Sequence, residues 1–530
     1  MKIYRFFTVI ILASVLLTGC KKKYTIDLDL FKQSFANSFN TLDSVQKKFY
    51  SQIYDTENPR PYWYNNVHDF NQKLDILNRF LSKSTEEHGI NSAIFLVDSI
   101  SKISASIDST NVDYAKLARL EMMMSKSYFD YCSAMKYGCF NPRKLYSNEY
   151  FIDVKRPDET FTNTTFDRLI EIESLQNYLD SIQPKTKDYI VLQRELKVQS
   201  TLKDRSKFWK IAANLERLRW TPVKTISHKH VRVNAANAML QMMRGDSIVN
   251  SLRVCVGKSG EHETPLMIGD MYEVILNPTW TVPTSIVVNE IVKKGGGIPS
   301  YIARNNMKIY KNGKVQHPCS IPWNLLNEKN QPYRIVQDSG NGNSLGLIKF
   351  NFDNPFSVYL HDTNARHVFN NLRRDVSHGC VRVQNPLKLA FFCLNDIDTT
   401  KKAEVNKRKL FEDRMRFSIG MKPVSEENAK TIAKTPEKKL RYIPLKPKVT
   451  VIIDYKTCYV GEDGKLVFTE DYYKMDDILM KKLNNIKVKT QIKPKESKDD
   501  KKKDAENKKD TIHILKVDTA KVEVEKKDSI

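Results

Sequence analysis

The sequence predicts an α+β protein: a helical N-terminal region, a mainly β domain with an inserted segment, and a Lys-rich tail. At 530 residues the chain is longer than one hydrophobic core usually supports, so several packed units are expected. Two changes along the sequence mark boundaries between these units. Apolar residues at helical spacing give way to short β-type runs after Trp220, and Lys-rich sequence of low complexity begins at Lys487.

The helical region is expected over residues 31–220. The stretch 67–77 is typical of it, because its apolar residues stand three and four positions apart. The region shows no repeat of fixed period, so a solenoid is not expected.

The β domain is expected over residues 221–400. It contains strand-like runs such as 230–234 and 252–256, and the Arg-Gly-Asp sequence at 244–246 suits a hairpin turn between them. Residues from about 286 to 332 break this pattern with a Gly-rich and polar segment. We interpret that segment as an insertion.

The chain beyond residue 400 is expected to form two further parts. Residues 401–486 combine a charged helical stretch with a small β element near 448–454, which predicts a C-terminal subdomain. Residues 487–530 are expected to be a disordered tail, because such a composition cannot bury enough apolar surface to fold.

The N-terminus has the features of a secretory signal. A charged start precedes an apolar stretch over residues 6–17, which is too short to cross a bilayer. Residues 17–20 then read Leu-Thr-Gly-Cys, which resembles a bacterial lipobox. We therefore expect a signal peptide over 1–19, lipidation of Cys20 and a tether over 20–30. An uncleaved anchor with an incidental cysteine is the alternative.

The chain is strongly basic, with a formal charge of +24. Nucleic acid is the usual partner of such a chain. Export argues against it, so no nucleic-acid partner is expected. Anionic wall polymer or a membrane surface are the expected acidic neighbours in that compartment.

The cysteines predict at least one free thiol. Of the eight in the sequence, Cys20 is assigned to the lipobox, which leaves an odd number. None of them forms a C-x-x-C pair, and most are interpreted as small buried apolar residues. Because His and Cys lack ligand spacing, no metal and no other cofactor is expected.

The segment with the clearest chemistry runs from Tyr359 to Val383. It contains His361, His378 and Cys380, with Gly379 directly before the cysteine. A thiol attacks a carbonyl only as thiolate, and an imidazole can serve first as its base and then as an acid. Gly379 lets the backbone turn sharply, so that nearby amides can face a developing oxyanion. Spacing alone does not show that His361 meets Cys380, because an irregular loop separates them.

Residues 377–382 read Ser-His-Gly-Cys-Val-Arg and follow an apolar strand that ends in a histidine. This motif resembles the signature of L,D-transpeptidases with a YkuD-type catalytic domain, and most closely the large, multi-domain periplasmic members. Four further blocks stand in the expected order: Asn214–Trp220, Leu276–Pro283, Asn343–Phe350 and Tyr359–Thr363. The similarity is strong from about 212 to 394. It is weaker over the N-terminal helices, which fit a scaffold domain, and does not reach the tail.

The resemblance implies a role for each residue of the motif. Cys380 would be the nucleophile and His361 the general base, oriented by Asp362 through its side chain or its backbone. His378 and Gly379 would shape the oxyanion site, with a structural role as the alternative for His378. Three more residues are expected to contact substrate, namely Arg382, Ser377 and Trp280. Arg382 would bind a substrate carboxylate or brace the loop, and Trp280 would lie at the base of a lid formed by the insertion.

The activity that the resemblance implies is the formation of 3→3 cross-links between peptidoglycan stem peptides. Cys380 would attack the L,D bond of a donor tetrapeptide, release D-alanine and hold a thioester, which a diamino-acid amine of a second stem would resolve. Attack by water would make the protein an L,D-carboxypeptidase or murein hydrolase, and an amine on another protein would make it a protein-to-wall ligase. A non-catalytic lipoprotein that tethers membrane to peptidoglycan is the alternative outside enzymes.

The same resemblance places the protein in the periplasm, anchored to a membrane by the lipid on Cys20. The outer membrane is favoured, because Lys21 stands where an Asp often signals retention at the inner membrane. One departure from the large relatives concerns residues 143–205. They show no clear counterpart of the separate peptidoglycan-binding module that such relatives often carry.

Overall fold

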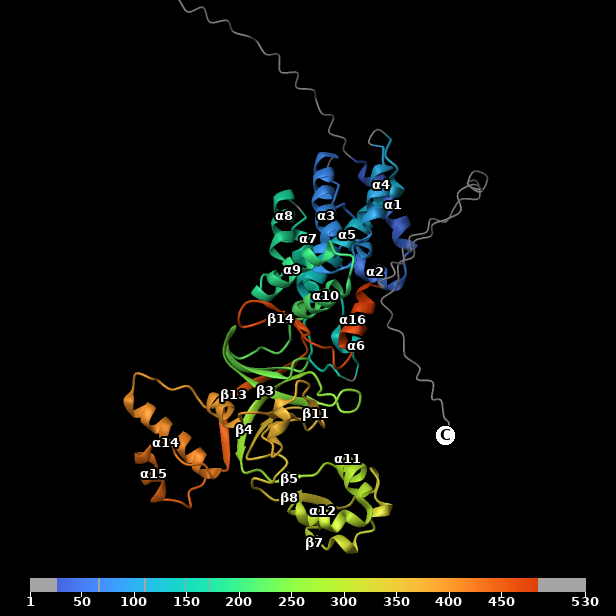
Figure 1. Cartoon of the computed structure of the whole chain (residues 1–530). Coiled ribbons are helices and arrows are strands. Elements are labelled where there is room, and N and C mark those ends of the chain that lie inside the picture. Colours follow the sequence, from blue (N-terminus) through green and yellow to red (C-terminus); the bar gives the residue numbers. More distant parts are fainter. Residues whose placement is uncertain (1–25, 65–66, 109–110, 148, 170, 485–530) are drawn as a thin grey trace, which may run out of the picture.

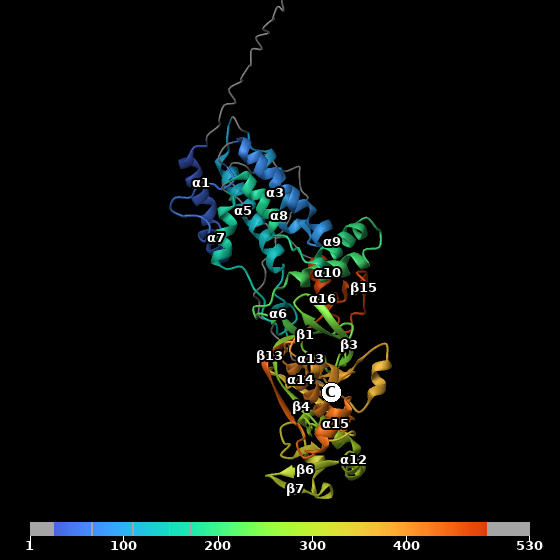
Figure 2. The same cartoon turned by 90° about the vertical axis from the view of Figure 1, so that its left-hand side faces the viewer.

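The computed structural model describes residues 26–484 apart from 65–66, 109–110, 148 and 170. The expected signal peptide, Cys20 and the Lys-rich tail therefore lie outside the described residues. Within the described part, a helical region, a β-barrel and a lid follow one another along the length of the molecule (Figure 1, Figure 2). The helices in this part include none with the length and apolar character needed to cross a bilayer.

The helical region packs around α5 (Tyr114–Tyr137), which is buried along most of its length. The carboxylate of Asp113 caps the start of α5 by accepting hydrogen bonds from two of its first backbone amides. The other helices of the region are α1 (Leu28–Asn40), α2 (Ser44–Ser51), α3 (Val67–His88), α4 (Val97–Ala105), α6 (Pro142–Leu145), α7 (Glu159–Asp167), α8 (Ile172–Ser181), α9 (Lys187–Ser200) and α10 (Ser206–Arg219). The helical N-terminal region predicted from the sequence is confirmed.

A buried ion pair on α10 ties the helical region together next to the barrel. The side chains of Glu216 and Arg219 are both 0% exposed, and Arg219 Nη2 lies 2.6 Å from Glu216 Oε2. Arg219 also donates to the carbonyl of His88, at the end of α3, and to the hydroxyl of Tyr189 on α9. Glu216 in turn accepts a hydrogen bond from the Trp220 indole. This pair therefore joins α3, α9 and α10.

Eight strands close into a barrel in the order β3-β12-β10-β9-β4-β13-β1-β2, with β2 pairing back onto β3 and β11 added to β3 as a further strand. Burial alternates along the strands, as in β9, because one side of each strand fills the barrel. The strands are β1 (Lys229–Asn234), β2 (Met239–Arg244), β3 (Ser247–Gly257), β4 (Met267–Leu276), β9 (Ile348–Phe352), β10 (Leu360–His361), β11 (Asp375–Ser377), β12 (Val381–Val383) and β13 (Tyr442–Asp454). The mainly β domain predicted from the sequence is confirmed.

Strand β13 shows that the barrel continues past the boundary expected at residue 400. Thr450 of β13 pairs with His230 of β1 on one side and with Asp270 of β4 on the other. The pattern near 448–454 predicted a strand but not its partners, because periodicity carries no information on which strands lie alongside. The same part of the chain adds α13 (Pro386–Cys393), α14 (Lys402–Ser418), α15 (Glu426–Ala433), β14 (Cys458–Val460), β15 (Leu466–Phe468) and α16 (Met475–Asn484).

The inserted segment is a small folded unit with its own apolar core, seen at the bottom of Figure 1. Its four-stranded sheet has the order β5-β8-β6-β7, and two short helices lie beside the sheet. The elements are β5 (Trp280–Thr281), α11 (Thr284–Ile286), α12 (Ile298–Arg304), β6 (Met307–Lys311), β7 (Lys314–Gln316) and β8 (Arg334–Gln337). We refer to residues 280–337 as the lid.

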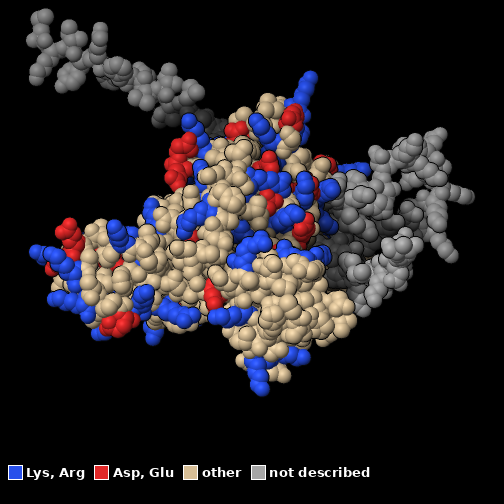
Figure 3. All heavy atoms as spheres, turned by 60° about the horizontal axis from the view of Figure 1, so that its bottom comes forward, with Lys and Arg blue, Asp and Glu red and all other residues tan. Residues whose placement is uncertain are grey.

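The basic side chains do not gather into one patch on the face shown in Figure 3. Lys and Arg are dense on the α14–α15 lobe at the left, but Asp and Glu stand among them. Over the centre of this face the basic side chains are spread in several places. The high net charge is therefore distributed over this surface.

Candidate active site

The residues of the sequence motif lie on one side of two neighbouring strands. β10 and β12 pair in parallel, with Leu360 opposite Val381 and His361 opposite Arg382. Leu360 and Val381 are fully buried in the barrel, so the residues that alternate with them point to the other side of the sheet. Cys380 stands two residues before Arg382. The fold therefore brings Cys380 and His361 to the same side.

The Cys380 loop, residues 377–380, is held by hydrogen bonds of its own. Ser377 Oγ donates to the Cys380 carbonyl (2.6 Å) and accepts from the Gly379 N–H (3.2 Å). Gly379 has a φ of 104°, a conformation that favours glycine. Because the Ser377 hydroxyl is used within the loop and the residue is 3% exposed, its placement favours loop positioning over the expected substrate contact.

Burial and nearby cations have opposite effects on the pKa of the Cys380 thiol. Burial raises the pKa of Cys380 above its ordinary value, while Tyr359, Lys349 and Arg382 act to lower it. Lys349 reaches the site from β9, where it pairs with His361, and its Nζ lies 4.0 Å from the centre of the Tyr359 ring. Because burial has the largest effect, Cys380 rests as a neutral thiol and needs a base to react.

His361 is buried and neutral. It is 5% exposed, and its pKa is lowered to about 3, first by burial and then by the charge of Arg382. Its Nδ1 is buried and forms no hydrogen bond with any residue that the structure describes. The ring meets that of Tyr359 edge to face at 5.6 Å. Backbone groups of Asp362 and Leu345 also contact the ring and act to raise the pKa of His361, but burial has the larger effect.

Asp362 does not direct its carboxylate at the His361 ring. Its Oδ2 accepts from the Leu347 N–H (2.9 Å), and both carboxylate oxygens accept from Arg366 at 2.8 and 3.1 Å. Gly346 allows this approach, because a Cβ there would lie 2.4 Å from Asp362 Cγ. A backbone hydrogen bond between Asp362 and the His361 ring opposes the effect of burial on the pKa of His361. Of the two expected ways to orient His361, the structure therefore favours the backbone.

His378 faces the lid. Its Nε2 lies 2.5 Å from Glu290 Oε1, and its ring packs 4.8 Å from that of His262. Glu290 belongs to the π-helical turn Val287–Ile291 of the lid. A cavity of about 360 Å³ opens here, lined by Lys258, Glu261, His262, Asn289, Glu290, Lys293, Val376, Ser377 and His378. His378 therefore links the Cys380 loop to the lid, and its expected part in the oxyanion site stays a prediction.

Arg382 and Trp280 lie at the edges of the site. Arg382 is partly exposed and forms no ion pair or hydrogen bond with the residues described in the structure, which leaves its guanidinium open to an anionic ligand. Trp280 begins the lid in β5 and interacts with the Tyr359 hydroxyl. A larger cavity of about 450 Å³ is lined by Asp362 but by neither Cys380 nor His361.

Sequence reasoning assigned no role to Lys349, Tyr359 or Glu290. Lys349 and Tyr359 stand inside the sequence blocks noted above, but Lys349 reaches Cys380 only because β9 pairs with β10. Its alternation with buried Phe350 could have indicated that Lys349 faces away from the core. Glu290 has no signal in the sequence, because its contact depends on where the lid lies.

The fold and the site together define a class of protein. A partly exposed thiol and a neutral imidazole share one side of a barrel, with two cations nearby and a lid beside them. Such an arrangement suits acyl transfer through a thiol, in which the imidazole moves the proton.

Two family models narrow this class. Residues 228–435 match the model of YkuD, the L,D-transpeptidase catalytic domain, and residues 48–196 match the model of the Scaffold domain. The chain therefore carries a YkuD L,D-transpeptidase catalytic domain behind an N-terminal Scaffold domain. The family predicted from the motif is confirmed.

Individual relatives cover part of the chain. A Haemophilus influenzae protein described as "Putative L,D-transpeptidase" is 35% identical over 193 residues, which are 36% of this chain and 38% of that protein. The match thus spans less than half the length of that relative. A solved structure described as the Ldtfm–avibactam carbamoyl enzyme is 12% identical, over 35% of this chain and 58% of that one. Its TM-score of 0.18 carries no argument about this protein.

Proposed function

We propose that this protein is an L,D-transpeptidase that forms 3→3 cross-links in peptidoglycan through a thioester on Cys380. The observation that carries the proposal is the pairing of β10 with β12, which brings Cys380 to the same side of the sheet as the His361 ring. The match of residues 228–435 to the L,D-transpeptidase catalytic domain supports the reaction class.

In the first half-reaction the Cys380 sulfur attacks the carbonyl of the L,D bond in a donor tetrapeptide stem. His361 takes the thiol proton as the C–S bond forms, and Lys349 and Arg382 stabilise the developing thiolate. The C–N bond then breaks, and the proton passes from His361 to the amine of D-alanine, which leaves.

In the second half-reaction the side-chain amine of a diamino acid in a second stem attacks the thioester. A C–N bond forms, the C–S bond breaks, and the proton lost by the amine returns through His361 to the Cys380 sulfur. Water competes with the amine at this step. We propose that the lid, which contacts the Cys380 loop through Glu290 and His378, shields the thioester from water and so favours transfer over hydrolysis.

The donor stem is anionic, and Arg382 supplies a matching charge. Its guanidinium is close enough to act on the pKa of Cys380 and has no carboxylate partner among the described residues. We therefore assign it the binding of a donor carboxylate, for which the planar guanidinium offers two parallel hydrogen bonds.

The site of action that we propose is the periplasm, with Cys20 lipidated and the outer membrane as the anchor. The Leu-Thr-Gly-Cys sequence at residues 17–20 supports this, as does a substrate that lies in the cell wall. The expected partners are peptidoglycan stem peptides and, through the lipid, a membrane.

Intact mass spectrometry of residues 21–530 with a carbapenem tests the nucleophile and the base. We expect one stoichiometric adduct on the wild type, none on Cys380→Ala and slower formation on His361→Ala. Cys319→Ala is the matched control, because Cys319 is a free and exposed cysteine in the lid and its loss should leave the adduct intact. An adduct that survives in Cys380→Ala contradicts the assignment. A wild type that forms none, while its thiol titrates, favours the non-catalytic tether.

Analysis of the products formed from purified tetrapeptide stems separates transfer from hydrolysis. We expect dimers joined 3→3 together with released D-alanine, both absent with Cys380→Ala. Release of D-alanine with tripeptide as the sole other product would instead identify an L,D-carboxypeptidase.

A further inference from the structure

Buried hydrogen bonds connect the Cys380 loop with the loop that follows β3. Thr264 Oγ1 donates to the Gly379 carbonyl (2.9 Å) and accepts from the Gly257 N–H (2.8 Å). Thr264 is 1% exposed, so these hydrogen bonds lie away from the protein surface. Gly257 packs closely against the loop that follows it, because a Cβ at residue 257 would lie 1.8 Å from the His262 carbonyl oxygen.

Tyr473, far along the chain, clamps the same two residues. Its hydroxyl accepts from the Thr264 N–H (3.2 Å) and donates to the Gly257 carbonyl (2.9 Å). One phenol therefore satisfies a donor and an acceptor that would otherwise be buried without partners. The position of Thr264, and through it that of Gly379, depends on the Tyr473 hydroxyl.

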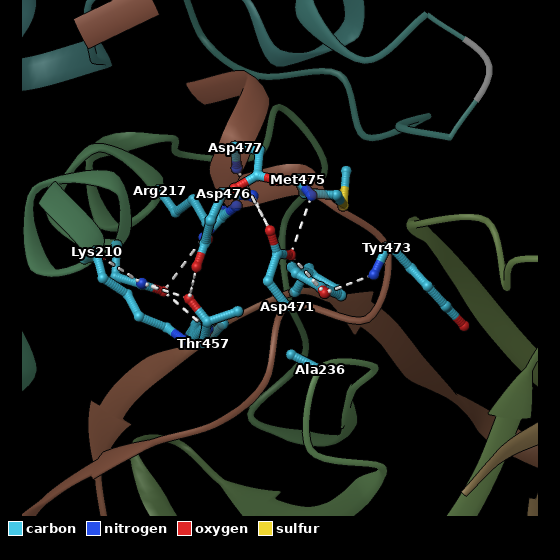
Figure 4. A network of polar contacts seen from close by, with 12 residues as sticks. Lys210, Arg217, Ala236, Thr457, Asp471, Tyr473, Met475, Asp476 and Asp477 are labelled. Carbon is cyan, nitrogen blue, oxygen red and sulfur yellow. Dashed lines mark hydrogen bonds and ion pairs between the residues drawn. The ribbon is translucent and has the colours of Figure 1, made fainter. Parts of the chain in front are cut away.

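Tyr473 is itself fixed from the side of the helical region. Its N–H donates to the Tyr455 hydroxyl (3.0 Å), which donates to Asp471 Oδ1 (2.8 Å), and the two tyrosine rings stack at 5.4 Å. Asp471 also accepts from the first amides of α16. Figure 4 shows this carboxylate pointing at the start of α16, while Asp476 of α16 points to Thr457 and pairs with Arg217 of α10. The hydrogen bonds that position Tyr473 therefore connect it, through Asp471 and α16, to α10 of the helical region.

The hydrogen bond from Thr264 affects the site because it fixes the peptide plane between Gly379 and Cys380. The carbonyl that Thr264 holds and the N–H of Cys380 belong to this one plane, so fixing the first fixes the direction of the second. The Cys380 N–H forms no hydrogen bond with any described residue. It is therefore free to donate to the oxyanion of an acyl intermediate, provided that its direction is held.

We infer that Tyr473 is a positioning residue for acyl transfer: acting through Thr264, it aims the backbone amide of Cys380 at the oxyanion. The inference rests on the proposed function. It extends the functional unit to the segment 455–476, whose hydrogen bonds to the barrel and to α10 hold Tyr473 in place.

Tyr473→Phe in the full-length protein tests this, with Tyr472→Phe as the matched control. The Tyr472 hydroxyl forms no hydrogen bond within the described residues, although it is the adjacent tyrosine. We expect Tyr473→Phe to slow acylation of Cys380 by a carbapenem by about ten- to hundredfold. Alkylation of Cys380 by iodoacetamide should stay at the wild-type rate, because that reaction forms no oxyanion. A general loss of structure would slow both reactions.

Thr264 provides a second set of variants. Thr264→Val should reproduce the slow acylation and Thr264→Ser should restore it, since serine keeps the hydroxyl. The double variant Thr264→Val/Tyr473→Phe should be no slower than the slower single variant, because both act on one path. Wild-type acylation in Tyr473→Phe, or additive losses in the double variant, would overturn the inference.

Hydrogen exchange of the Cys380 loop separates this inference from the proposed function. Amides of residues 377–381 should exchange faster in Tyr473→Phe and at the wild-type rate in Tyr472→Phe. If the wild type forms no adduct, the proposed function fails and exchange alone decides whether Tyr473 positions the loop. Unchanged exchange in Tyr473→Phe refutes the positioning role in either case.

Discussion

Replacing Glu216 by Gln should strongly destabilise the helical region, because it leaves a buried cation unpaired. Arg219 makes two hydrogen bonds to Glu216 Oε2, at 2.6 and 3.2 Å, and both side chains are 0% exposed. In Glu216→Gln an amide oxygen can still accept from the Trp220 indole, but an amide NH₂ then faces the guanidinium. Breaking a buried pair by removing one partner costs about 3–5 kcal/mol, so we expect the free energy of unfolding to fall by that amount.

Urea denaturation followed by circular dichroism measures this change, with Asp153→Asn as the control. Asp153 also pairs with an arginine, Arg143 at 2.6 Å, but these side chains are 69% and 53% exposed. Exposed pairs contribute about 1 kcal/mol or less, so Asp153→Asn should lie close to the wild type. Losses of equal size in the two variants would refute the argument that burial makes the Glu216–Arg219 pair essential.

Three further predictions concern titrating groups. Lys349→Met should shift the pH dependence of Cys380 alkylation to higher pH, because it removes a cation that lowers the pKa of Cys380; an unchanged profile would show that Lys349 does not act on the thiol. Acylation should show no loss of rate near pH 6.5 on acidification, because the pKa of His361 is lowered to about 3; an acid limb near that pH in kcat/KM would contradict a buried neutral base. Burial raises the pKa of Glu121, a buried residue of α5, to about 7, above its ordinary value of 4.5. The contribution of Glu121 to stability is therefore complete below pH 4.5 and is lost as the pH rises through 7. Thermal unfolding of Glu121→Gln between pH 5 and 8 should therefore depend less on pH than that of the wild type, and equal slopes would refute this.

The sequence was sufficient to predict the residues to which we assign the chemistry, because their types and order are local. Cys380, Gly379 and His361 lie within one short stretch, and the alternation along β10 and β12 follows from the periodicity of a strand. The sequence did not predict residues that approach Cys380 only because two strands pair. Lys349 depends on the register between β9 and β10, which no local pattern encodes.

The largest difference between expectation and structure is the strand that the sequence placed in a separate C-terminal subdomain. β13 lies between β4 and β1, so a boundary at residue 400 would divide one barrel. The pairing joins residues more than two hundred positions apart, such as His230 and Thr450, and such pairings are outside the reach of spacing arguments. The helix caps, by contrast, follow from short-range rules, as with Asp113 before α5.

The place of β13 changes what the minimal catalytic unit must contain. A fragment that ends at residue 400 lacks β13, so β4 and β1 each lose a full ladder of backbone hydrogen bonds and the barrel stays open. A fragment that ends after β13 closes the barrel but lacks Tyr473, and Thr264 and Gly257 then lose the hydroxyl that satisfies both. The first fragment should therefore fail to fold. The second should be strongly destabilised, because it also removes Asp476 and leaves the buried Arg217 without its partner. The segment after β13 packs into the same apolar core as the barrel, although it lies outside the barrel by topology, so a catalytic fragment should include it.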